Sequence, residues 1–208
     1  MLSRHTVRAL AAAAAIAVGA AWPVRALAQY EYDPLQNRPA LLFAHAGAYG
    51  PLVHLDETRD VDFKTGFTLG GGVGYHFSRH IALRGSFNFA RVELQDEAFG
   101  STIAGTKFNR YLYDADVQLR YPLRGGVVPY AFAGLGGTTV QRDTARNRSS
   151  FTKGAGKLGL GASYSIRESP ASVFLEATGW IYQWDRYGFD NTQIDIAVTG
   201  GVSYRFKP

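Results

Sequence analysis

The stretch 193–206 constrains the fold more than any other part of this sequence. Every second residue in it is apolar or Gly, and the residues between are small or polar. The first set comprises Ile194, Ile196, Val198, Gly200, Val202, Tyr204 and Phe206. Strict alternation with a period of two predicts a β-strand with two chemically different faces. About ten residues of a tilted strand cross the hydrocarbon core of a bilayer, so this strand is long enough to span one.

The first 28 residues indicate export rather than a part of the fold. Arg4 and Arg8 lie in a basic start, residues 9–21 are an apolar run, and Ala26-Leu27-Ala28 matches an A-x-A cleavage site. The apolar run is too short for a membrane-spanning helix, which needs about twenty residues. We therefore expect residues 1–28 to be a cleaved signal peptide.

Composition excludes several classes of site. The chain has no Cys, which removes disulfides and thiolate metal sites from consideration. No cluster of Lys and Arg suggests nucleic acid as a partner, although the net charge is +5. The 24 Gly and 13% aromatic residues fit strands that carry small residues on one face and rings near the membrane surfaces.

Seven further segments alternate in the same way, and the clearest is 111–121. The predicted strands before the last one are 40–55, 66–77, 81–94, 111–121, 127–141, 152–166 and 171–185. The segments between them are alternately short and long, the third long one being the polar, basic loop 142–151. An even number of strands joined as simple hairpins predicts an all-β fold, an eight-stranded antiparallel up-and-down barrel, because closure removes the unpaired edge that lipid does not tolerate. We expect a periplasmic lead-in over 29–38 and the transmembrane barrel over 39–208.

Alternation alone does not show which face of each strand points outward, because a soluble lipocalin-like barrel has the same alternation. Side-chain size decides between the two facings. The polar faces are mostly Gly, Ala, Ser and Thr, whereas a water-facing exterior carries long charged side chains. The apolar faces carry rings placed as an aromatic girdle, namely Tyr111, Tyr113, Tyr121, Tyr130, Tyr164, Tyr204 and Phe206. We therefore expect the apolar faces to meet lipid. The facing of the first and fifth strands stays open, and the apolar face of the fifth is taken as Val128, Tyr130, Phe132, Thr138 and Val140.

This facing places charged residues inside the barrel. The predicted lumen network consists of four cations, Arg84, Arg120, Lys157 and Arg205, and four carboxylates, Asp114, Asp116, Glu176 and Asp195. Buried charges are costly unless they are paired. An eight-stranded interior has room only for its own side chains, so we expect the network to plug the barrel.

The end of the chain carries the one sharp motif. Thr199, Gly201, Tyr204 and Phe206 follow the pattern polar-x-Gly-x-x-aromatic-x-aromatic, which resembles the terminal assembly signal of outer-membrane β-barrels. Members of that group usually stop at the aromatic residue, whereas Lys207 and Pro208 follow here. With the signal peptide and eight strands, the chain resembles the small outer-membrane β-barrel family, which includes the outer-membrane protein A barrel domain and the opacity-type surface antigens.

The resemblance implies a Gram-negative type of outer membrane and a structural or surface-interaction role. It implies the barrel-assembly machinery, membrane lipid and lipopolysaccharide as partners, and we expect a monomer without a cofactor. Binding, if any, is expected in the external loops, where Arg142, Arg146, Arg148 and Lys153 form a basic patch that suits lipopolysaccharide phosphates.

Two other functions stay open as alternatives. One is a lipid A-modifying enzyme, which needs a Ser/His/acid set near the outer leaflet. His76 and His80 lie by the first short turn, His54 by a loop with Asp56 and Glu57, and His45 near Glu176, so we expect no catalytic set. The other is a narrow channel through the Gly-rich faces. No His/Asp/Glu cluster has the spacing of metal ligands.

Overall fold

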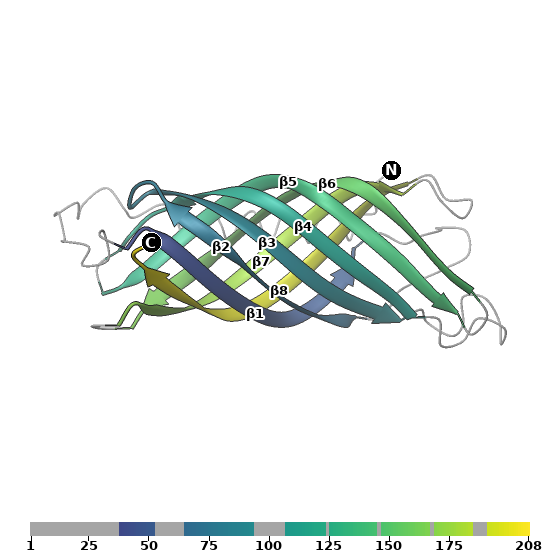
Figure 1. Ribbon diagram of the computed structural model, residues 1–208, viewed down its shortest axis with the longest axis horizontal. Helices are drawn as coiled ribbons and strands as arrows, with labels where there is room; N and C mark the ends of the chain where they lie inside the picture. The colour runs from purple at the N-terminus through teal and green to yellow at the C-terminus, as the bar shows by residue number, and fades with distance from the viewer. Residues whose placement is uncertain are drawn as a thin grey trace. The chain divides into compact units, whose positions relative to one another are not determined.

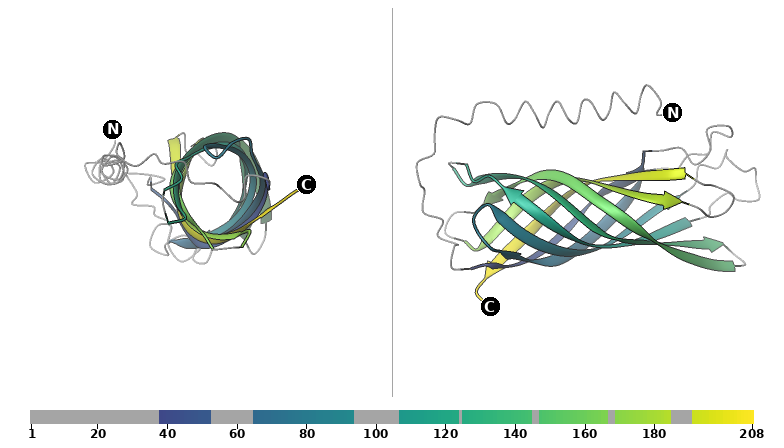
Figure 2. Two further views of the ribbon diagram at one scale, coloured as in Figure 1. Left: turned by 90° about the vertical axis from the view of Figure 1, so that its left-hand side faces the viewer. Right: turned by 90° about the horizontal axis from the view of Figure 1, so that it is seen from above.

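Eight strands close into a barrel in the computed structural model, which describes residues 38–52, 65–93, 107–123, 125–144, 147–166, 169–184 and 191–208. The strands are β1 (Ala40–Pro51), β2 (Gly66–His76), β3 (Ile81–Glu93), β4 (Lys107–Arg120), β5 (Val127–Thr144), β6 (Asn147–Ser165), β7 (Ala171–Trp184) and β8 (Asn191–Phe206). Each strand is antiparallel to the next, and β1 pairs with β8 to complete the ring (Figures 1 and 2). The predicted all-β fold is confirmed. The predicted signal peptide and nearly all of the lead-in lie outside the described residues.

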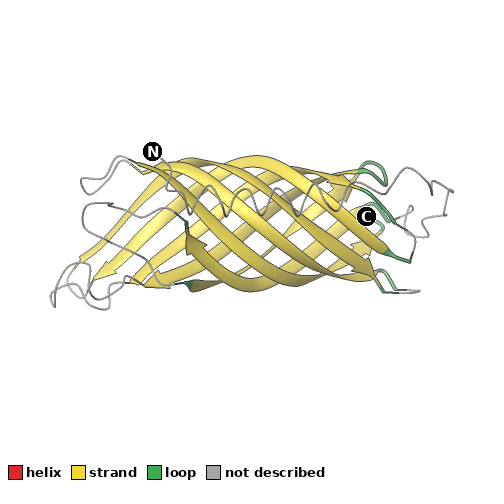
Figure 3. Cartoon of the chain, turned by 180° about the vertical axis from the view of Figure 1, so that it is seen from behind, coloured by secondary structure: helices red, strands yellow, loops and turns green. Residues whose placement is uncertain are grey.

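All of the described secondary structure is strand (Figure 3). None of the described segments forms a helix with the length and apolar character needed to cross a bilayer. We call the end that carries the start of β1 and the end of β8 the proximal end, and the opposite end the distal end. Residues 77–80, 121–126 and 166–170 connect strands at the proximal end.

The proximal turns are tight because their backbone groups bond across the hairpin. The amides of Phe77 and Leu123 donate to the carbonyl oxygens of Ile81 and Val127, at 3.1 and 2.8 Å. Gly125 and Gly126 both have a φ of 85°, a conformation that costs a residue with a Cβ roughly 1–2 kcal/mol. These two glycines therefore allow the chain to turn directly from β4 into β5.

The apolar faces of β2, β3, β4, β6, β7 and β8 point outward, as the alternation predicts. Large apolar side chains on them are highly exposed in the isolated chain, for example Val73 at 60% and Leu175 at 62%. The alternate residues are buried in the lumen, with Asp116 at 1% and Glu176 at 2%. A soluble barrel with an apolar interior requires the opposite facing, so that alternative is wrong.

The facing of β5, which the sequence leaves open, places its larger apolar residues inside the barrel. The residues taken as its apolar face, Val128, Tyr130, Phe132, Thr138 and Val140, are all buried and face the lumen. Tyr130 therefore does not belong to the outer girdle. The outward face of β5 carries Leu135, which is 76% exposed, together with smaller apolar residues. On β1, Leu41, Phe43 and Tyr49 face inward, which settles a facing that the sequence leaves open.

The lumen accepts these rings because glycines lie opposite them. Phe132 pairs with Gly159 and Tyr130 with Gly161 in the register of β5 and β6. A Cβ added at Gly161 would lie only 2.7 Å from Cζ of Tyr130, so the ring occupies the space that a side chain would fill. The rings of Tyr130 and Phe132 therefore fit inside the barrel because these glycines leave space for them.

The predicted third loop is also wrong. Residues 142–151 were expected to be a loop, but β5 continues to Thr144 and β6 begins at Asn147, with these two residues paired. The hairpin they form reaches further than its neighbours at the distal end (Figure 1). Polar residues fill this part of both strands, so the apolar alternation that marks a strand disappears from the sequence although the ladder continues.

Candidate functional site

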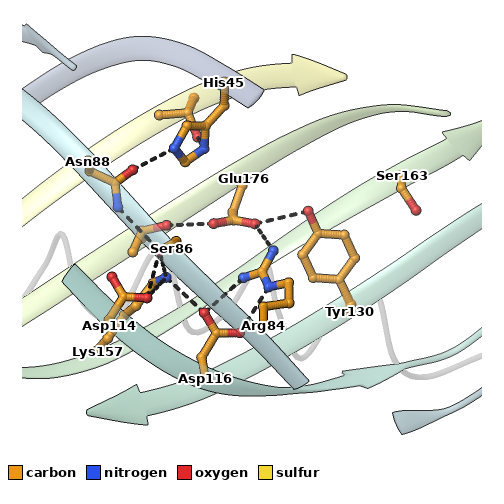
Figure 4. Close-up of polar contacts among 12 residues, drawn as sticks. His45, Arg84, Ser86, Asn88, Asp114, Asp116, Tyr130, Lys157, Ser163 and Glu176 are labelled. Carbon is orange, nitrogen blue, oxygen red and sulfur yellow. Dashed lines mark hydrogen bonds and ion pairs between the residues drawn. The ribbon is translucent and has the colours of Figure 1, made fainter. Parts of the chain in front are cut away.

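A network of ion pairs crosses the middle of the lumen (Figure 4). Arg84 of β3 donates from Nε to Oδ1 of Asp116 at 2.9 Å and from Nη1 to Oε2 of Glu176 at 2.8 Å. Lys157 of β6 donates from Nζ to Oδ1 of Asp114 at 2.6 Å and to Oδ2 of Asp116 at 2.8 Å. Five of the predicted lumen residues therefore meet, and Asp116 is shared between both cations.

Neutral groups extend this network toward β1 and β8. Ser86 donates to Oδ1 of Asp114 at 2.7 Å, and Asn88 donates to Oγ of Ser86 at 3.3 Å. His45 Nε2 lies 2.5 Å from Oδ1 of Asn88, and its Nδ1 lies 3.5 Å from the hydroxyl of Thr199. With an amide oxygen at Nε2, that nitrogen is the donor, so Nδ1 faces the hydroxyl as the acceptor.

Glu176 has three partners from three strands. In addition to Arg84, Tyr130 donates its hydroxyl to Oε2 at 3.1 Å and Thr178 donates to Oε1 at 3.0 Å. A carboxylate buried to 2% exposure needs such partners, because an unpaired buried charge costs several kcal/mol. His45 is not among the recorded hydrogen-bond partners of Glu176, so the structure gives no support to a His45–Glu176 catalytic pair.

Aromatic rings lie close to the two cations of the network, Arg84 and Lys157. The guanidinium carbon of Arg84 lies 4.6 Å from the ring centroid of Phe132, 5.5 Å from that of Phe43 and 5.8 Å from that of Tyr130. Lys157 Nζ lies 5.2 Å from the centroid of Phe132. Cation–π attraction adds to the ion pairs at such distances, and the rings exclude water from around them.

A second, distal tier contains a pair that the sequence analysis missed. Arg110 of β4 donates from Nη1 to Asp195 of β8, and also to the hydroxyls of Tyr49 and Tyr182 at 3.0 and 2.6 Å. Tyr182 donates in turn to Oδ2 of Asp195 at 2.9 Å, and Tyr49 donates to the same oxygen. Arg110 lies four residues before Asp114 on the same face, so extending the alternation backward along this strand would have found it.

Apolar side chains surround this distal tier. The cluster that contains the two tyrosines consists of Tyr49, Ala90, Val92, Phe108, Leu112, Val140, Phe151, Ala155, Trp180, Tyr182 and Ala197. The ring centroids of Tyr49 and Trp180 are 6.1 Å apart. The Arg110–Asp195 pair, whose side chains are both 0% exposed, is thus held in an apolar layer above the central network.

The other two predicted lumen cations, Arg120 and Arg205, lie near the proximal end. Arg120 of β4 places Nη1 3.0 Å from Nδ1 of His76. Arg205 of β8 donates from Nε to the carbonyl oxygen of Arg38 at 3.1 Å. The printed contacts of these two arginines thus lie on the proximal side of the two tiers.

The other candidate residues have these positions. Arg142 lies in β5 and Arg148 in β6, Lys153 pairs with Thr138 in the β5–β6 ladder, and Arg146 lies outside the described residues. His54 also lies outside them. Within the described ranges, no group of three His, Asp or Glu side chains has the geometry of a metal site.

The residues of the predicted assembly signal divide between the two faces of β8. Thr199 is 3% exposed in the lumen, whereas Tyr204 is 50% and Phe206 39% exposed on the outer wall. Gly201 faces inward, where an added Cβ would lie 2.8 Å from Cβ of His45. The motif therefore presents its two rings outward at the proximal end of the last strand.

Comparison with protein families gives a match that covers most of the chain. The family model described as "outer membrane protein beta-barrel domain" matches residues 9–206. No curated protein matches the chain.

Solved structures share the fold at low sequence identity. Neisserial surface protein A is 16% identical, with a TM-score of 0.61, over 80% of this chain and 97% of that one. The N-terminal barrel domain of Pseudomonas aeruginosa OprF is 14% identical, with a TM-score of 0.52, over 81% and 98% of the two chains. OprG of the same organism is 14% identical, with a TM-score of 0.50, over 85% and 100%.

Proposed function

Because this chain belongs to the outer-membrane protein β-barrel family, we propose that it is a closed barrel with a structural or surface-interaction role. The family places it in a Gram-negative type of outer membrane. The proximal end would face the periplasm, since short turns and both chain ends lie on that side in bacterial barrels. Any ligand of the exterior would then bind at the distal end.

The cross-lumen ion pairs are the observation that carries this proposal. Arg84 on β3 reaches Glu176 on β7, and Arg110 on β4 reaches Asp195 on β8. In each pair the two strands are four apart in a ring of eight, so the side chains meet from opposite walls. Two such bridges, with rings packed around them, leave no room for a wide aqueous path. This supports a plugged barrel over a channel.

The distal β5–β6 hairpin is the best-supported place for surface interaction. It extends beyond the neighbouring strands, and its sequence includes Arg142, Arg146, Arg148 and Lys153. Guanidinium and ammonium groups bind phosphate well, so lipopolysaccharide phosphates are the ligand that this chemistry favours. Reversing the charges of Arg142 and Arg148 to Glu should weaken lipopolysaccharide binding while the barrel stays folded, and equal binding by the variant would remove this part of the proposal.

Two experiments test the proposal as a whole. Fractionation of the native host should place the protein in the outer membrane, with a gel mobility that changes on heating as closed barrels show. Purified protein in planar bilayers should give no steady, reproducible openings. A protein dissolved in the periplasm would contradict the location and facing, and regular conductance steps would contradict the plug.

A further inference from the structure

We propose that the proximal mouth of the lumen contains a binding site for a small inorganic oxyanion, with phosphate or sulfate as the natural probes. The site is a cavity of about 40 Å³ below the central network. A single water molecule needs roughly 10–15 Å³ of cavity volume measured in the same way. The cavity thus has room for an anion of a few heavy atoms and excludes an extended ligand.

The charge of the lining is the first argument. Among the described residues that line the cavity are Arg84, Arg120 and Arg205, and none of these described lining residues is an Asp or a Glu. The carboxylates of Asp116 and Glu176, which do not line the cavity, both accept hydrogen bonds from Arg84. An anion in the cavity would therefore meet guanidinium groups first.

The hydroxyl groups are the second argument. Ser163, Ser172 and Ser203 line the same cavity, and Ser172 and Ser203 are directly opposite each other in the β7–β8 register. Arg205 follows Ser203 by two residues, so both side chains lie on the lumen face of β8. Hydroxyl and guanidinium donors that converge on one space suit the several oxygens of a tetrahedral anion.

Burial is the third argument. Arg205 and Ser172 are both 7% exposed, and Gln118, which also lines the cavity, is 4% exposed. Charge-assisted hydrogen bonds are stronger in such a site than at a hydrated surface, because the local dielectric is lower. Arg84 lines the cavity and also belongs to the central network, so the cavity borders that network.

The test is a titration of the purified, isotope-labelled full chain in a phosphate-free maltoside detergent, followed by amide NMR shifts. Sodium phosphate, at constant ionic strength, should give saturable shifts at residues around Ser172, Ser203 and Arg205 and none at the distal end. Sodium chloride should not reproduce them. Glycerol 3-phosphate should bind more weakly because its glycerol has no room, and saturation by that ester alone would overturn the proposal.

Variants make the test specific. Arg205→Gln should weaken phosphate binding by about tenfold, as expected for the loss of a charged hydrogen bond. The double variant Ser172→Ala/Ser203→Ala removes two donors with little change of volume and serves if Arg205→Gln does not fold. Arg79→Gln, an exposed change in the turn at the same end, should bind as the native chain does. Shifts that never saturate, or equal loss in the Arg79 variant, would overturn the site.

Discussion

Arg84 and Glu176 form an ion pair of 2.8 Å across the lumen, from strands on opposite walls of the barrel. Their side chains are 5% and 2% exposed, and each has further partners, Asp116 for the arginine and Tyr130 for the glutamate. A barrel closed only by its ladder would keep its fold without this bridge. The Arg84–Glu176 ion pair instead determines how the side chains in the lumen are arranged.

The first prediction concerns that pair. Arg84→Gln leaves Glu176 buried without its cation and should lower the free energy of unfolding by about 3–5 kcal/mol. Glu176→Gln in the same chain removes the orphaned charge and should restore part of the loss. Urea unfolding in lipid vesicles, followed by tryptophan fluorescence, measures the four members of this double-mutant cycle.

The control for this cycle is Arg79→Gln, at an exposed turn position, which should change stability by about 0.5 kcal/mol or less. If the losses for Arg84→Gln and Glu176→Gln simply add in the double variant, the two side chains are not energetically coupled, and the bridge does not stabilise the lumen.

A second prediction follows from the glycine that lies beneath Phe132. A Cβ at Gly159 would lie 2.5 Å from the carbonyl oxygen of Ala177 and closer still to the ring of Phe132. Gly159→Ala should therefore cost about 1–3 kcal/mol through overpacking. Gly154→Ala, on the same strand with nothing within 4 Å of the added Cβ, is the matched control and should cost nothing.

Combining Gly159→Ala with Phe132→Leu tests the cause. The smaller side chain frees space, so the double variant should lose less stability than the two single losses added together. Equal costs at Gly154 and Gly159 would show that the backbone preference of glycine, and not its contact with the ring, decides the effect.

These two regions also show where sequence reasoning succeeds and where it fails. Alternation of apolar and polar residues places Leu175 outside and Glu176 inside without any structure, because neighbouring side chains of a strand point to opposite faces. The same rule misplaced Tyr130, because both faces of β5 are apolar or small and the larger residues were assigned to lipid. Which face is inside there depends on Gly161 of the neighbouring strand, and strand register is not visible in the sequence.

The candidate site, too, could be predicted from the sequence only in part. The charged residues of the central network could be named from their face alone, but not their partners, because Arg84 and Glu176 are 92 residues apart in the chain. Arg110 was missed because the alternation was followed only from Tyr111 onward. The basic hairpin was read as a loop because a strand without apolar residues has no periodic signal.

A third prediction tests the contact of the outer wall with lipid. Leu135 lies near the middle of β5 and is 76% exposed on the outward face. Arg at the bilayer midplane of a barrel costs about 2–4 kcal/mol, and near the interfaces it costs about 0–1. Leu135→Arg should therefore destabilise the barrel in vesicles strongly, whereas Leu123→Arg, in the proximal turn, should have little effect. Similar small costs at both positions would contradict a hydrocarbon layer around the middle of the barrel.

The last prediction concerns the rings at the end of β8. Phe206 is exposed on the outer wall, where its Cα pairs with that of Ala40 of β1 at the seam that closes the barrel. If the assembly machinery recognises this ring, Phe206→Ala should reduce the folded protein in the outer membrane of cells several-fold while spontaneous refolding into vesicles proceeds with similar yield. Lys207→Ala, one residue further and outside the ladder, is the control and should assemble normally. A variant that fails equally in cells and in vesicles would show that Phe206 acts through closure of the seam, because its loss then weakens the β1–β8 junction itself rather than a recognition step.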